Sequence, residues 1–139
     1  MAGLLHDLGK LVLVTNFKDT YRQVLTEFRN SDHKLWQLEQ AAFGTSHAEI
    51  GAYLMGLWNL ENPIIEAIAF HHRPSKNAVS QLGLLTAVHA ANALDHEEDS
   101  PEDQEPDLQY DIEYLDRLGV SDRIPEWRRV CNEYAERNA

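Results

Sequence analysis

The feature that most constrains the fold is a spacing of apolar residues by three and four positions, which continues along most of the chain. The segments TYRQVLTEFRN (20–30) and HKLWQLEQAAF (33–43) show it clearly. No stretch alternates apolar and polar residues for long enough to predict a strand. Such a pattern is typical of helices whose apolar stripes meet in a shared core. We therefore predict an all-α domain, a compact multi-helix bundle of about six or seven helices.

Start and stop signals divide this pattern into separate helices. Ser46 and Glu49 form a capping-box pair that begins one helix. Asn62 followed by Pro63 begins the next. The helices predicted after these points cover roughly residues 81–94, 110–118 and 125–137.

Length and composition indicate one domain over residues 1–139, with 43% hydrophobic residues to form its core. No segment approaches the roughly 20 apolar residues of a membrane span, and the start lacks the basic region and cleavage site of a secretory signal. The lone Cys131 cannot form an internal disulfide, which suits a reducing compartment. These features predict a cytoplasmic protein without a membrane partner.

The net charge of −11 is concentrated in one segment. Residues 95–107, DHEEDSPEDQEPD, hold eight acidic residues and neither Lys nor Arg, so the other 15 acidic residues nearly balance the 12 bases. Without apolar residues, this segment is predicted to be a mobile, solvated loop within the domain. The chain also lacks a basic patch that would neutralise phosphates, so we expect no nucleic-acid partner.

The segment LLHDLGKLVL (4–13) places polar groups inside an apolar run. On a single helix, Asp7 would share a face with three leucines, and His6 and Lys10 would flank it. The leucines of that face are Leu4, Leu8 and Leu11. An unpaired carboxylate in apolar surroundings costs several kcal/mol. We therefore expect Asp7 to be neutralised by a cation, by hydrogen-bond donors or by a metal ion.

Three histidines fall on or beside the predicted apolar stripes: His47, His71 and His72. Each of them alone is more often a hydrogen-bonded core residue than a ligand. Together with Asp7, however, neutral imidazoles form the usual ligand set for Zn, Fe or Mn. His89 is expected to serve ordinary packing.

Four segments resemble the HDOD branch of the HD superfamily, the HD-related output domain of bacterial signalling proteins. They are HDLGK (6–10), GTSHAEIGAYLMGLWNL (44–60), IIEAIAFHHRP (64–74) and LLTAVHAANAL (84–94). The resemblance implies an HD-type helical bundle and a divalent metal such as Fe, Mn, Zn or Mg. It carries metal-ligand roles onto His6, Asp7, His47, His71 and His72, and a phosphate contact onto Lys10.

The chain also departs from the catalytic relatives, which hydrolyse phosphate esters or cyclic di-GMP at a dinuclear metal site. Those relatives have a ligand upstream of the HD pair, and only five residues precede His6 here. Asn92 stands where they have an aspartate, and Arg73 follows the histidine pair where the cyclic di-GMP enzymes have a glutamate. The resemblance thus implies a non-catalytic output domain that contacts signalling proteins and requires no cofactor. The alternatives are a metal-dependent phosphohydrolase and a structural polar cluster that binds nothing.

The HDOD resemblance further implies several helices before the HD pair. The chain is therefore expected to be an N-terminally truncated domain, in which Leu4, Leu8 and Leu11 lack packing partners. Exposed apolar patches of several hundred Å² usually bind a partner. On this basis we predict a homo-oligomer, specifically a two-fold dimer.

Overall fold

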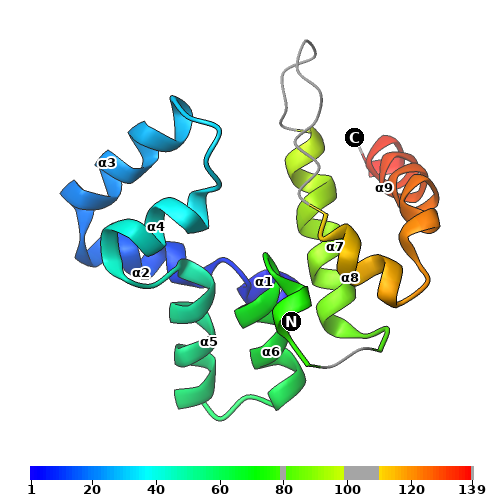
Figure 1. Cartoon of the computed structure of the whole chain (residues 1–139), viewed down its shortest axis with the longest axis horizontal. Coiled ribbons are helices and arrows are strands. Elements are labelled where there is room, and N and C mark those ends of the chain that lie inside the picture. The colour runs from blue at the N-terminus through cyan, green and yellow to red at the C-terminus, as the bar shows by residue number, and fades with distance from the viewer. Residues whose placement is uncertain (79–80, 99–109, 139) are drawn as a thin grey trace.

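The computed structural model describes residues 1–78, 81–98 and 110–138. Over these ranges the chain forms nine α-helices, two short 3₁₀ helices and no strand (Figure 1). The elements are α1 (Ala2–Leu5), α2 (Leu8–Asn16), α3 (Lys18–Arg29), α4 (Leu35–Phe43), α5 (His47–Leu57), α6 (Asn62–Phe70), η1 (Pro74–Lys76), α7 (Leu84–Glu98), α8 (Ile112–Arg117), η2 (Ser121–Arg123) and α9 (Ile124–Asn138). The predicted all-α fold is confirmed, with more helices than expected. None of the described helices is long and apolar enough to cross a membrane.

Helix α6 lies in the middle of the molecule and contributes to two hydrophobic cores. In Figure 1, α2, α3 and α4 lie on one side of α5 and α6, and α7, α8 and α9 lie on the other. Ala67 packs in a core with residues of α7 and α8, such as Leu85 and Leu115. Its neighbour Ile68 packs with Met55 of α5 in the second core. Two adjacent residues of one helix therefore join the two halves of the fold.

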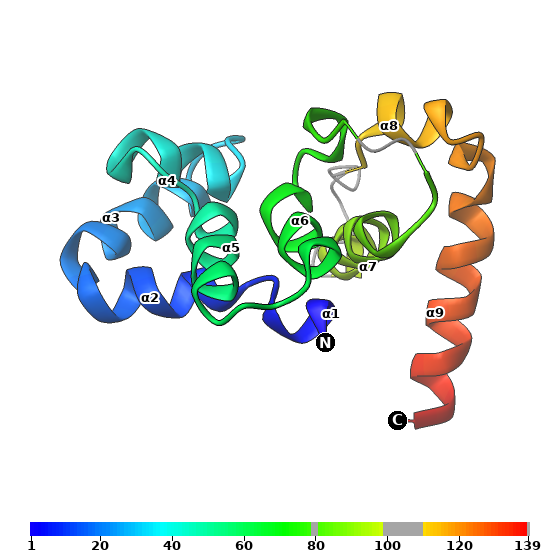
Figure 2. The ribbon, with the colours of Figure 1, turned by 90° about the horizontal axis from the view of Figure 1, so that it is seen from below.

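Helix α9 lies beyond α7, on the side of the molecule away from α6 (Figure 2). Its Trp127 is partly buried against the core that α7 and α8 share. Farther along the helix, the Val130 and Tyr134 side chains are 51% and 70% exposed. The second half of α9 is therefore held to the body of the protein by few apolar contacts.

The LLHDLGKLVL segment is not the single helix that its spacing predicted. The chain leaves the helix at His6 and Asp7, so α1 contacts α6 and α7 while α2 packs on α5. Leu4 is 89% exposed, and the buried positions of α2 are Gly9 and Leu13. The prediction that Leu4, Asp7, Leu8 and Leu11 share one face was wrong, because it assumed a single helix. The break changes the direction of the chain, so the 3.6-residue period of α2 does not continue into α1.

Helix α5 begins where its capping box predicted. The Ser46 backbone N–H donates to Glu49 Oε2 at 3.0 Å, and the Glu49 N–H donates to Ser46 Oγ at 3.4 Å. These reciprocal bonds satisfy two of the free N–H groups at the start of the helix. They place His47 at the first position of α5.

Helix α7 extends farther than predicted. It continues to Glu98, four residues into the acidic segment 95–107 that was expected to be a loop. Residues 99–107 of that segment lie outside the described residues. The acidic residues of this stretch do not prevent a helix, because Asp and Glu cost only a fraction of a kcal/mol relative to Ala in a helix.

The crossing of α2 over α5 brings two helix backbones into direct contact. A Cβ atom on Gly9 would overlap the carbonyl oxygen of His47. On the α5 side, a Cβ on Gly51 would lie 3.5 Å from the Gly9 nitrogen and 3.2 Å from Ile68 Cγ2. Only glycine permits this approach at position 9, and the approach places the start of α2 beside His47.

We expect Gly9→Ala to destabilise the protein by about 1–3 kcal/mol or more, because the added methyl group must push two backbones apart. Chemical denaturation measures the loss. Gly56→Ala is the matched control, since a Cβ at Gly56, also within a helix, would meet nothing within 4 Å. The control should keep or slightly raise the stability, by up to about 1 kcal/mol. Equal stability of the two variants would contradict the close crossing.

Candidate metal centre

Four side chains that metals favour converge beside the α2–α5 crossing. Asp7, His47, His71 and His72 each offer one ligand atom, and these four atoms all lie within 4.8 Å of one another. Asp7 precedes α2, His47 begins α5, and the two remaining histidines follow α6. In the described part of the chain, no second group of three or more His, Cys, Asp and Glu ligands comes together in this way.

The atoms at the centre of the cluster are mostly acceptors that face one another. His47 Nε2 lies 2.9 Å from His72 Nε2 and 3.2 Å from Asp7 Oδ1. His71 Nε2 is shielded from solvent, lies 3.9 Å from Asp7 Oδ1 and makes no hydrogen bond. Buried nitrogen atoms without a hydrogen-bond partner are rare and call for an explanation. A cation placed among these atoms would satisfy them, so the donor set fits a metal ion.

The other ring nitrogen of two of these histidines is held by a backbone or carboxylate oxygen. His71 Nδ1 donates to the Ile68 carbonyl at 2.8 Å, which leaves Nε2 directed at the cluster. His47 Nδ1 donates to Glu39 Oε2 at 2.5 Å. Metal-binding histidines usually donate their second N–H in this manner, which sets the tautomer and the ring orientation.

Glu39 is a residue that the sequence analysis missed. It lies on α4 with no exposed surface, and its carboxylate also accepts from the His47 backbone N–H at 2.9 Å and from the Tyr21 hydroxyl at 3.0 Å. In the sequence, it is one of five polar residues in the amphipathic segment 33–43. The one available signal was an acidic residue next to Leu38 on the buried stripe of that helix.

Lys10 and His6, both predicted to take part in the site, bind the opposite edge of Asp7. Lys10 Nζ donates to Asp7 Oδ2 at 2.6 Å. His6 Nε2 lies 3.5 Å from the same oxygen, and His6 Nδ1 donates to the Gly3 carbonyl at 2.8 Å. His6 therefore lies outside the group of four. The sequence left open how the charge of Asp7 is neutralised. In the structure, the partly buried carboxylate lies against the Lys10 ammonium group and the imidazole rings of His6 and His47.

Burial and neighbouring charges set the protonation of the cluster. Burial lowers the pKa of His71 to about 3. It also lowers the pKa of His72, with help from the adjacent His71 and His47 rings. Burial acts to raise the pKa of Asp7, but hydrogen bonds from His47 and Lys10 outweigh it and keep the carboxyl ionised. Two neutral imidazoles and a carboxylate are the forms in which these groups bind metals.

His47 differs from the other two histidines. Burial acts to lower its pKa, but hydrogen bonds to Asp7 and Glu39 outweigh burial and raise the pKa above its ordinary value. The His47 ring lies between two carboxylates, with Nδ1 toward Glu39 and Nε2 toward Asp7. Because a ligand must be deprotonated to bind, the raised pKa of His47 would oppose metal binding at low pH.

A small pocket reaches the edge of the cluster. It has a volume of about 170 Å³ and lies between α2, α3 and α4. Its lining residues are Lys10, Phe28, Lys34, Leu35, Trp36, His47 and His72. Next to it, the Arg73 guanidinium lies 4.7 Å from the Trp36 ring centre and binds Glu49 at 3.2 Å. Two lysines, Lys10 and Lys34, line this pocket, and no acidic residue does, although the chain as a whole is acidic.

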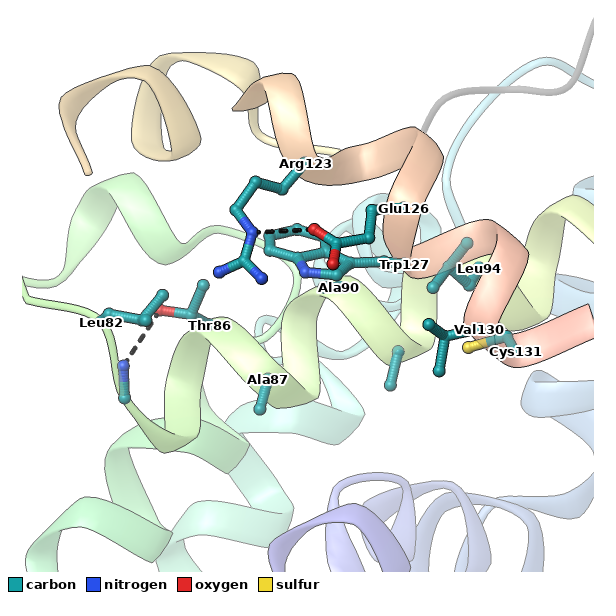
Figure 3. Close-up of a pocket in the computed structure, with 12 residues that line it drawn as sticks. Leu82, Thr86, Ala87, Ala90, Leu94, Arg123, Glu126, Trp127, Val130 and Cys131 are labelled. Carbon is teal, nitrogen blue, oxygen red and sulfur yellow. Dashed lines mark hydrogen bonds and ion pairs between the residues drawn. The ribbon is translucent and has the colours of Figure 1, made fainter. Parts of the chain in front are cut away.

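A larger groove lies elsewhere, between α7 and α9 (Figure 3). It has a volume of about 630 Å³ and is lined mainly by apolar side chains, with Trp127 and Val130 on the α9 side. One ion pair, Arg123 with Glu126 at 3.1 Å, lies at its rim. None of the four clustered ligands lines this groove, so the groove and the cluster are separate features.

Two residues of α7 lie near the cluster without joining it. His89, as expected, serves packing: it is buried, donates to the His71 carbonyl at 2.6 Å and accepts from the Asp111 N–H at 2.9 Å. Asn92 is also buried but lies outside the group of four.

Comparison with known proteins places the chain in a family. The HDOD domain model matches residues 1–74, which include all four clustered ligands. An uncharacterized protein of Treponema pallidum (strain Nichols) is 35% identical over 95 residues, which are 66% of this chain and 18% of the Treponema protein. No solved structure matches the chain. The chain belongs to the HDOD domain family, and it spans about a fifth of the length of this relative.

The lowered pKa of His71 predicts a pH-dependent stability of the metal-free protein. The unfolded chain protonates His71 near its ordinary value of 6.5, whereas the folded protein does so only near 3. The unfolded state therefore binds more protons between these values, and the stabilisation present above 6.5 should be lost as the pH falls toward 3. Urea unfolding of chelator-treated protein between about pH 7.5 and about pH 4.5 measures this slope.

His71→Gln removes this titration and should flatten the slope. His33→Gln, at an exposed histidine, is the control and should keep the wild-type slope. His47 is unchanged in both variants, so its opposite contribution cancels in the comparison. Identical slopes in the two variants would show that His71 is not held neutral.

Proposed function

We propose that this HDOD domain is a non-catalytic output domain of signal transduction, which acts through contacts with signalling proteins and holds one divalent metal ion. The observation that carries the proposal is the convergence of four side-chain ligands on one centre. Four protein ligands complete a tetrahedral shell, as in structural sites, whereas catalytic sites keep a position open for water or substrate. A dinuclear hydrolase would need ligands for a second ion about 4 Å away.

Asp7, His47, His71 and His72 would hold the ion. Three imidazoles and one carboxylate favour Zn, Fe or Mn over Mg, because Mg prefers oxygen ligands. A bound ion would supply crosslinks between the start of α2, the start of α5 and the end of α6. In this proposal it stabilises the arrangement of helices that a partner contacts.

The exposed apolar surface supports a role that depends on contacts. Leu4 and Leu11 are 89% and 61% exposed, and the α5 side chains Tyr53 and Leu57 are 68% and 63% exposed. Large exposed apolar patches mark interaction sites. We propose that a second copy of the chain contacts the outer side of α1 and α2, to give a two-fold dimer.

A metal-dependent phosphohydrolase is the second candidate. The small pocket lined by Lys10, Lys34, His47 and His72 favours it, because lysines beside a metal centre can hold a phosphate group. Its volume of about 170 Å³ suits a small group better than a whole nucleotide.

Elemental analysis combined with hydrolysis assays separates these candidates. We expect protein purified without added metal to contain about one ion of Zn, Fe or Mn per chain, and no metal in Asp7→Ala. Asp19→Ala, at an exposed aspartate of α3, is the control and should keep the ion. Neither a phosphomonoester nor cyclic di-GMP should be hydrolysed. Metal-dependent turnover that Asp7→Ala abolishes would support the hydrolase instead, and a wild-type protein without metal affinity would remove the metal from the proposal.

Self-association through α1 and α2 has its own test. We expect light scattering to give the mass of a dimer for the wild-type chain and a shift toward the monomer for the double variant Leu4→Ser, Leu11→Ser, because the exposed leucines lose their apolar area. Leu82→Ser, at a leucine that is 60% exposed near α7, should remain dimeric. A wild-type monomer at high concentration would contradict this part of the proposal.

A further inference from the structure

Glu39 occupies a position where the helix pattern favours an apolar side chain. Its neighbour Leu38 is buried as well, and Glu39 itself has no exposed surface. Removing an ionised carboxylate from water costs several kcal/mol unless donors replace the lost hydration. The helix keeps this group although a leucine would pack there at no such cost. The partners of the carboxylate therefore indicate what it does.

Three hydrogen bonds from two residues hold the Glu39 carboxylate. Two of them belong to His47: the ring Nδ1–H at 2.5 Å and the backbone N–H at 2.9 Å, both on Oε2. The third, the Tyr21 hydroxyl, binds Oε1 at 3.0 Å. With both oxygens occupied, the carboxylate has one orientation. Glu39 offers no atom to the group of four, so it acts only through His47.

We propose that Glu39 is the positioning residue of the metal centre, and that Tyr21 holds it in place. The carboxylate accepts the proton on His47 Nδ1, so Nε2, which faces Asp7 and His72, is the ring nitrogen available to a metal. Without this acceptor, the ring gains freedom to rotate or to carry its proton on Nε2, where the proton would block the metal. This inference rests on the proposed metal site and adds the residue that prepares one of its ligands.

The hydrogen bonds from Tyr21 to Glu39 and from His47 to Glu39 also connect the proposed metal centre to helices that supply no ligand. Tyr21 lies on α3 and Glu39 on α4, and these two helices pack against each other to one side of α5 (Figure 1). A metal ion bound at Nε2 of His47 would make the Nδ1–H a stronger donor to Glu39. A bound metal should therefore strengthen the hydrogen bond by which Glu39 of α4 binds His47 of α5.

Zinc affinity of the folded protein, measured by competition with a chelating indicator, tests the proposal. We expect Glu39→Gln, which keeps the side-chain shape but loses the charge, to bind zinc about 10–100-fold more weakly than the wild type. Tyr21→Phe should give a smaller loss, because Glu39 stays in place. Glu39→Asp restores the carboxylate and should recover part of the affinity. Glu27→Gln, at an exposed glutamate of α3, should bind like the wild type.

A spectroscopic measurement on the wild-type protein keeps the test independent of how the variants fold. The ring ¹⁵N chemical shifts of His47 should show a protonated Nδ1 and, with zinc, a metal-bound Nε2. A Nε2–H tautomer in the wild type, or a folded Glu39→Gln protein with unchanged zinc affinity, would overturn the role of Glu39 alone. A wild-type protein that binds no zinc would overturn the metal proposal together with this inference.

Discussion

The backbone contact between α2 and α5 at Gly9 is the constraint on which the site depends. Since position 9 carries no Cβ, α2 can lie directly against the carbonyl group of His47. This contact carries Asp7, two residues earlier, to 3.2 Å from the His47 ring. Helix α6 packs on α5 and is followed by two histidines, which complete the cluster. Three helix ends meet because two helices approach more closely than side chains ordinarily allow.

Charge balance within the cluster explains why polar groups remain among apolar helices. Asp7 is compensated by Lys10 and His47, and Glu39 by His47 and Tyr21. His47 therefore lies between two carboxylates, and its ring links them without a metal. A divalent ion would place positive charge among these groups and would also satisfy His71 Nε2. The same residues can thus support the metal-free fold and bind a metal.

The HDOD match and the remaining helices divide the molecule into two parts. All four clustered ligands and Glu39 lie within residues 1–74, whereas α7, α8 and α9 follow the matched region. The large apolar groove belongs to the second part and contains none of the clustered ligands. Helix α6 joins the parts, because Ala67 faces one core and Ile68 the other. Helix α6 and the hydrogen bond from His89 to the His71 carbonyl therefore connect the clustered ligands to the α7 side.

The sequence by itself determined the features that depend on neighbours along the chain. Helix type follows from apolar spacing, and the start of α5 follows from Ser46 and Glu49, which interact three residues apart. Residue chemistry together with the HDOD resemblance also singled out Asp7 and the three histidines. Only the tertiary structure decided the break at His6, the approach of His47 to Asp7 and the burial of Glu39. These features depend on which helix faces meet, and contacts between residues distant in sequence leave no periodic pattern in the chain.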